Sequence, residues 1–214
     1  MSNPAPQPHY GIIVPVKPPV IAKSRLSGLG DDLRRDLVVA FAADTILAAA
    51  QSPLVDVVLA VTDDHQLART LSELGALVIP DGTTDDLNGT LLEAAYEVRR
   101  RRPELRVAAL CADLPALRAD DLTRALVTAP PSLSFVADRA GVGTTLLVAP
   151  TPELFTPRFG PDSRDAHLDA GAVDLDIADI ASLRHDVDTP ADLVAALELG
   201  VGPRTSTVVT GLTL

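Results

Sequence analysis

Three aspartates stand where the sequence could build a metal site. Asp113 comes two residues after the apolar run RVAALC, and Asp186 and Asp188 alternate within RHDVDTPADL. Alternating residues of an extended segment face the same side, and two carboxylates held together repel each other unless a cation lies between them. Hard cations such as Mg²⁺ prefer carboxylate oxygens. The three aspartates together therefore predict a metal site, although Asp113 alone is also typical of a turn before proline.

A basic cluster follows the first apolar run of the chain, in VKPPVIAKSRL. Lys17 and Lys23 are the only two lysines in the sequence, and Ser24 and Arg25 come directly after the second. A lysine ammonium is a compact point charge suited to phosphate, and arginine does not replace it freely. The segment is neither a Walker loop nor GxGxxG. We interpret it as a loop that binds a triphosphate, in preference to a solvated basic loop.

Glycines and hydroxyl residues gather in two later segments, RAGVGTTLL and RFGPDS. Gly160 leaves backbone amides accessible, and Thr145 and Ser163 add hydroxyl groups. Such loops can hold a carboxylate or a phosphate. A hairpin turn for the first segment and an irregular loop for the second are equally good interpretations, and both stay open. His167 and His185 lack a third soft ligand and are expected to be structural.

Short apolar runs alternate with helical patterns along the chain. Strands are expected at 10–16, 55–62, 76–80, 106–111, 134–138 and 144–149, with two more around Leu175 and Leu183; helices are expected at 31–50, 64–74, 87–102, 119–128 and 190–199. Thr189, with proline at the next position and Asp192 three residues on, is a good helix start. Near-continuously apolar strands between helices predict an α/β fold with a mostly parallel sheet covered on both faces.

The predicted topology places the polar candidates on one rim. In such sheets, ligands bind beyond the carboxyl ends of the strands. The residues that come just past the expected strand ends are Lys17, Asp63, Asp81, Asp113 and Asp138.

Composition limits the function further. The net charge of -11 and the 3% of aromatic residues argue against a nucleic-acid partner. Cys111 is the single cysteine, so we expect no internal disulfide and a cytoplasmic, reducing location. No apolar run reaches the ~18 residues that cross a bilayer, so no membrane partner is expected. Residues 1–9 read as a disordered leader, and 10–214 as a single domain.

A set of motifs, in order along roughly residues 10 to 200, resembles one family. These are IIVPVK and AKSRL, DLNGTL, CADLPAL, SFVADRAGVGTTLL, RFGPDS and HDVDTPADL. They resemble the guanylyltransferases of deazaflavin coenzyme F-420 biosynthesis, and most of all the phosphoenolpyruvate branch, whose sister branch uses 2-phospho-L-lactate. The VDTPADL ending also occurs in related nucleotidyltransferases, whereas RFGPDS together with VADRxGxGTT is much more specific.

The resemblance implies a nucleotidyltransferase fold, Rossmann-like with three αβα layers, and a reaction. GTP and phosphoenolpyruvate would give enolpyruvyl-diphospho-5′-guanosine and pyrophosphate, with Mg²⁺ as cofactor. By position, the triphosphate would meet Lys17, Lys23, Ser24 and Arg25, and Asn88 would lie at the nucleoside. Asp113, Asp186 and Asp188 would hold the metal, and the acceptor would meet Thr145, Gly160 and Ser163. The residues expected to be catalytic are Lys17, Lys23, Arg25 and Asp113. DDLNGTL departs from the family pattern, which has glycine just before Leu87.

Other functions remain open at this stage. The acceptor could be 2-phospho-L-lactate or 3-phosphoglycerate, and the same fold could act on a sugar phosphate or a molybdopterin-type cofactor. A nucleotide-binding scaffold would bind nucleotide without needing Mg²⁺ and would release no pyrophosphate. The fate of the expected product suggests a downstream transferase as a partner.

Overall fold

The computed structural model describes residues 7–17, 30–82 and 86–210 of the 214-residue chain. Most of the expected leader, and all of Lys23, Ser24 and Arg25, lie outside the described residues. The strands are β1 (Tyr10–Pro15), β2 (Val55–Val61), β3 (Leu77–Ile79), β4 (Arg106–Leu110), β5 (Ser134–Ala137), β6 (Thr144–Ala149) and β7 (Val173–Asp174). The helices are α1 (Asp31–Ala50), α2 (His65–Glu73), α3 (Leu87–Arg101), α4 (Ala119–Thr128), α5 (Ser163–Asp169), α6 (Ala181–Arg184), α7 (Pro190–Leu199) and α8 (Pro203–Val209), with a 3-10 turn η2 (Pro152–Leu154).

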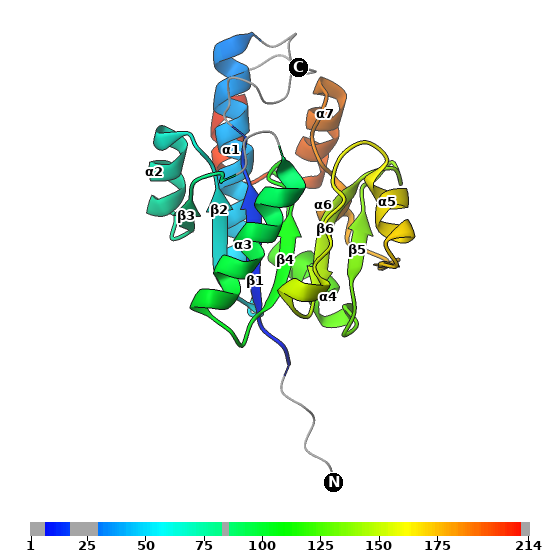
Figure 1. Ribbon diagram of the computed structural model, residues 1–214. Coiled ribbons are helices and arrows are strands. Elements are labelled where there is room, and N and C mark those ends of the chain that lie inside the picture. The colour runs from blue at the N-terminus through cyan, green and yellow to red at the C-terminus, as the bar shows by residue number, and fades with distance from the viewer. Residues whose placement is uncertain (1–6, 18–29, 83–85, 211–214) are drawn as a thin grey trace.

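One sheet of seven strands in the order β3-β2-β1-β4-β6-β5-β7 forms the centre of the domain (Figure 1). β1 pairs in parallel with β2 and β4, and β2 pairs in parallel with β3. β6 is antiparallel to both β4 and β5, whereas β7 is parallel to β5. The mostly parallel sheet predicted from the sequence is confirmed. The carboxyl ends of β1 to β5 meet at one rim, where β6 begins.

Successive residues of the central strand bury opposite faces of the sheet. Ile12 packs in the core on one face, which α1 and α4 cover, and Ile13 packs in the core on the other, which α3 covers. Figure 1 shows α3 in front of the sheet and α1 behind it. α3 approaches β1 so closely that a Cβ on Gly11 would lie 2.4 Å from a methyl carbon of Val98. The strand therefore needs glycine at this position.

A third, smaller core joins α1 to the C-terminal helices. Leu37 and Phe41 of α1 pack with Val187, which precedes α7, and with Leu193 of that helix. Asp44 on the same helix, only 4% exposed, accepts hydrogen bonds from the N-terminal end of α8. The C-terminal part of the chain is thereby fixed against the helix that follows β1.

The expected strand around Leu183 is wrong, because this segment is the helix α6. Ser182 donates to the buried carboxylate of Asp121 on α4, 2.6 Å away, which draws the chain off the sheet edge. A single turn of helix then suffices to bury Leu183 in the core. The strand expected around Leu175 is confirmed nearby as β7, whose last residue precedes it.

Besides α6, two further helices were not predicted, α5 and α8. α5 has only 7 residues and begins after Asp162, which has a positive φ of 54°. A helix this short, with an irregular residue before it, leaves no clear pattern in the sequence. α8 has 7 residues and follows Gly202 with little apolar periodicity. Among the described residues, no helix has both the length and the apolar character needed to cross a membrane.

Candidate active site

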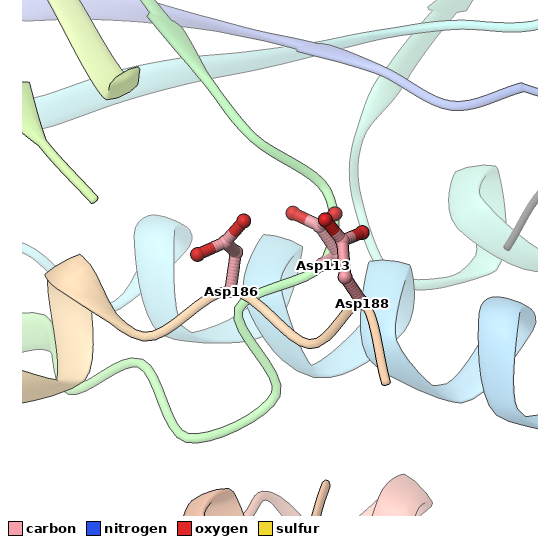
Figure 2. Close-up of side chains that lie close together, drawn as sticks. All are labelled: Asp113, Asp186 and Asp188. Carbon is pink, nitrogen blue, oxygen red and sulfur yellow. The ribbon is translucent and has the colours of Figure 1, made fainter. Parts of the chain in front are cut away.

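The three predicted metal-ligating aspartates lie together at the carboxyl rim of the sheet. Asp113 stands in the loop after β4, and Asp186 and Asp188 stand in the segment between α6 and α7. One carboxylate oxygen from each lies within 4.8 Å of the others, and all three residues are partly buried. Figure 2 shows Asp186 and Asp188 on the same side of their segment, with Asp188 beside Asp113. The alternation read from the sequence thus gives the expected arrangement.

A backbone hydrogen bond joins the two loops that carry these aspartates. The N–H of Val187 donates to the carbonyl oxygen of Asp113 at 3.0 Å. Val187 is fully buried in the core formed with α1. Because its side chain points into that core, the neighbouring aspartates on each side must point away from it. Burial of one valine therefore sets the direction of two carboxylates.

The start of α7 also holds the cluster. Thr189 and Asp192 form the predicted helix start as a capping box. The Asp192 carboxylate accepts hydrogen bonds from the N–H of Asp188 at 3.3 Å and of Thr189 at 2.9 Å, and Arg139 donates to it at 3.2 Å. Partial burial raises the pKa of Asp192, but hydrogen bonds from the Thr189 hydroxyl and from the two backbone N–H groups, together with the Arg139 charge, outweigh it, so the pKa lies below its usual value. The ionised Asp192 carboxylate therefore fixes the backbone at Asp188.

Other predicted rim residues form structural contacts. Asp63, after β2, accepts from the N–H of Asp81, after β3, at 2.9 Å. Asp138 accepts from the N–H of Val142 at 2.9 Å and of Gly143 at 2.8 Å, and so holds the β5–β6 turn. The hairpin interpretation of RAGVG is therefore correct. Lys17 is exposed just beyond β1, at the same rim.

The expected acceptor residues occupy the start of β6 and the loop before α5. Thr145 is buried, and its hydroxyl donates to the carbonyl of Val136 at 3.4 Å. Gly160 is exposed with a φ of 142°, and Ser163 is the buried first residue of α5. The role of these residues toward an acceptor stays a prediction.

Asn88, expected at the nucleoside, makes a different contact within the described residues. Its amide donates to the carbonyl of Phe159 at 3.0 Å, and its side-chain carbonyl accepts from the Phe159 N–H at 2.8 Å. Asp86, which precedes Leu87 where the family pattern has glycine, caps α3 by accepting from the N–H of Gly89 at 3.0 Å. The departure from the family pattern thus has a local structural reason.

His167 is a buried residue that connects β6 to the segment before α5. It is fully buried, and its ring nitrogens contact Thr144 at 2.9 Å and the N–H of Arg158 at 2.9 Å. Burial first, and the Arg158 charge to a smaller extent, lower its pKa to about 4 against the opposing effect of a hydrogen bond to the Ser163 backbone. The expectation that it is structural is confirmed.

The fold and the rim of carboxylates define the class of protein. The structure matches a nucleotidyl transferase from Methanothermobacter thermautotroptrophicus with a TM-score of 0.61 at 16% identity, over 89% of this chain and 97% of that one. It matches 4-diphosphocytidyl-2C-methyl-D-erythritol synthase with a TM-score of 0.60 at 9% identity, over 90% and 99% of the two chains. The chain therefore has the nucleotidyltransferase fold.

Sequence comparison then gives the family. Residues 10–212 match the model of the family described as guanylyl transferase CofC like, and the chain belongs to this family. It is 51% identical to the phosphoenolpyruvate guanylyltransferase of Streptomyces coelicolor over 93% of this chain and 95% of that protein. It is 50% identical to the Streptomyces scabiei protein of the same name, over 92% and 94%. For the one from Mycolicibacterium vanbaalenii the identity is 43%, over 92% and 93%. The resemblance inferred from the motifs is confirmed.

Proposed function

We propose that the protein is a phosphoenolpyruvate guanylyltransferase, which converts GTP and phosphoenolpyruvate into enolpyruvyl-diphospho-5′-guanosine and pyrophosphate for coenzyme F-420 biosynthesis. The observation that carries the proposal is identity near 50% to relatives of that name over almost the whole chain, together with the cluster of three aspartates. Membership of the guanylyl transferase family supports GTP as the nucleotide substrate. The name of the relatives supports phosphoenolpyruvate as the acceptor.

The donor set fits a magnesium ion. The three carboxylates offer only oxygen ligands, within 4.8 Å of one another, from two loops that a backbone hydrogen bond holds together. Hard oxygen ligands are what Mg²⁺ selects, and it commonly binds through a few carboxylates plus substrate phosphates. Asp113, Asp186 and Asp188 would hold the ion, which supplies Lewis-acid stabilisation of the reacting phosphates.

The chemistry needs positioning and charge neutralisation more than proton transfer. An oxygen of the acceptor's phosphate attacks the α-phosphorus of GTP, and the bond to the bridging oxygen breaks as pyrophosphate leaves with the electron pair. A phosphate monoester is already anionic at neutral pH, so the attacking oxygen needs no general base. Two anions must approach in a protein of net charge -11. Lys17 at the rim, with Lys23 and Arg25 beyond the described residues, would offset this repulsion.

The acceptor is proposed to bind at the part of the rim that lies beside β6 and α5, away from Lys17. Thr145 at the start of β6 and Gly160 and Ser163 before α5 would take the carboxylate and phosphate of phosphoenolpyruvate. The exposure of Gly160 supports this, since an accessible backbone amide suits an anionic oxygen. A cytoplasmic location and a downstream transferase that receives the product belong to the same proposal.

Pyrophosphate release tests the proposal directly. The protein would be incubated with GTP and Mg²⁺, and in parallel with phosphoenolpyruvate, 2-phospho-L-lactate or 3-phosphoglycerate. Release with phosphoenolpyruvate is the expected result. Release with only another acceptor would support guanylyl transfer but show that the acceptor is not phosphoenolpyruvate. No release with any of the three, despite binding of GTP, would contradict the proposed reaction.

A further inference from the structure

The backbone of Arg158 and Phe159 is held from two sides by side chains outside the metal cluster. Asn88, in the first turn of α3, bonds both the N–H and the carbonyl of Phe159, at 2.8 and 3.0 Å. His167, on α5, accepts from the N–H of Arg158 at 2.9 Å. The two elements that supply these side chains lie on different parts of the fold, with α3 over the centre of the sheet and α5 beyond β5 (Figure 1). The loop is thus clamped between them.

The hydrogen bonds define the protonation state of His167. A backbone N–H can only donate, so Nε2 must be the unprotonated nitrogen that accepts from Arg158. Nδ1 then carries the proton and lies 2.9 Å from the Thr144 hydroxyl oxygen, which can accept it. The ring packs edge-on against Phe159 with centroids 5.2 Å apart, and its burial holds it neutral. A neutral imidazole of fixed tautomer makes a rigid bridge between β6 and the loop.

Gly160, an exposed residue, directly follows the two clamped residues. Within the described part of the chain, the N–H of Gly160 has no protein acceptor, whereas those of Arg158 and Phe159 are both bonded to side chains. Its φ of 142° is in a region that side-chain-bearing residues rarely adopt. Ser163 follows at the start of α5, the helix that carries His167. Any shift of the two clamped residues would move the Gly160 N–H with them.

We propose that Asn88 and His167 are positioning residues for the phosphorylated acceptor, which set the Arg158–Phe159 backbone so that the Gly160 N–H and Ser163 face the acceptor's anionic groups. This inference rests on the proposed function and deepens it, since it names what determines the acceptor's place. It also assigns Asn88 to the acceptor side. Both functional groups of its amide are engaged with Phe159, so it fixes the acceptor loop in place of contacting the nucleoside.

The test separates the affinity for the acceptor from that for GTP. Asn88→Ala and His167→Ala are each expected to raise the KM for phosphoenolpyruvate tenfold or more, because displacements on the order of 1 Å already cost large factors in rate. Binding of a non-hydrolysable GTP analogue with Mg²⁺, measured by calorimetry without acceptor, is expected to stay within twofold. The double variant should lose less than the product of the two single effects, since both act on one loop.

Amide hydrogen exchange gives a readout that does not depend on turnover. A peptide spanning residues 156–162 should exchange faster in both variants, because the Arg158 and Phe159 N–H groups lose their acceptors. The matched control is Ser52→Ala, which removes the hydrogen bond between the buried Ser52 and Thr123, 2.8 Å away, at the opposite end of the sheet. It is expected to lower stability while leaving both the acceptor KM and this exchange unchanged.

The other possible results test the positioning role of each residue separately. A drop in affinity for the GTP analogue in Asn88→Ala would place Asn88 at the nucleoside and overturn its positioning role. An unchanged acceptor KM in folded Asn88→Ala and His167→Ala would overturn it for both residues. Failure of the proposed function would appear differently, as absent turnover by the unaltered protein, with faster exchange in the variants still showing that the clamps hold the loop.

Discussion

The carboxylate of Asp44 accepts the N–H of Thr205 at 2.8 Å and that of Arg204 at 3.1 Å. It thereby ties α8 to α1 across 161 positions of sequence. The contact is so close that a Cβ on Gly202 would lie 2.3 Å from the Asp44 carboxyl carbon. Since α1 also packs against Val187, this tie holds α8 beside the same small core that orients the segment with Asp186 and Asp188.

Removing this carboxylate should destabilise the fold. Asp44→Ala leaves two backbone N–H groups without their acceptor in a buried place, which costs about 1–3 kcal/mol for each unsatisfied group. Urea unfolding followed by circular dichroism would measure the loss. Asp36→Ala, an exposed position on the same helix, is the control and should change the free energy of unfolding little. Equal stability of the two variants would contradict the importance of this contact.

The aspartate cluster should govern both turnover and metal binding. Asp188→Asn keeps the size of the side chain but removes a charge that would face the metal, so turnover is expected to fall on the order of a hundredfold. The Mg²⁺ concentration for half-maximal rate should rise as well. The comparison is Asp169→Asn, an exposed aspartate at the end of α5. Turnover of Asp188→Asn equal to that of this control would remove Asp188 from the site.

His167 should make the protein sensitive to acid. Its pKa is lowered to about 4 in the folded protein, by burial first and by the Arg158 charge, with the Ser163 backbone opposing, whereas an unfolded chain has a histidine pKa of about 6.5. Between these values the unfolded state binds more protons, so this contribution to stability is complete above about pH 6.5 and is lost as pH falls toward 4. Urea unfolding at a series of pH values would show the decline.

A glutamine at the same position serves to assign that decline. His167→Gln has no imidazole to titrate, so its unfolding free energy should fall less steeply between pH 6.5 and 4, from a lower starting value. His65→Gln, which alters an exposed histidine, should keep the slope of the unaltered protein. Parallel curves for His167→Gln and the unaltered protein would contradict the assignment.

Gly11 should tolerate no side chain while Val98 is present. Gly11→Ala places a Cβ 2.4 Å from a Val98 methyl carbon, and overpacking of this kind costs roughly 1–3 kcal/mol. Adding Val98→Ala should relieve the clash, so the double variant is expected to lose less than the sum of the two single losses. Additive losses in the unfolding free energy would show that no clash connects the two positions.

Several features could be predicted from local sequence. Alternating apolar runs and helical periods gave the α/β class and the helix at Asp31–Ala50 without error at either end. Asp186 and Asp188 were predicted to share a face because their spacing alone decides it in an extended segment. Thr189 and Asp192 were predicted as a helix start because capping uses residues three apart. Each of these relations involves residues that are neighbours along the chain.

What local sequence missed depends on partners far away in the chain. Leu183 was expected in a strand, but Ser182 bonds Asp121, 61 positions earlier, and the segment turns into a helix. Nothing near Asn88 indicates that its amide bonds Phe159, 71 positions later.

The sequence by itself determined the order of most strands and helices, to within a residue or so at the strand ends, and the carboxylates and basic residues placed just past those ends. Tertiary structure decided which of these residues meet. Asp113 joins Asp186 and Asp188 only because Val187 is buried against α1 and its N–H reaches the Asp113 carbonyl. Likewise His167 became a neutral bridge only because packing removed it from water. Side-chain type and short-range geometry follow directly from the sequence, whereas burial and long-range hydrogen bonds exist only once the chain has folded.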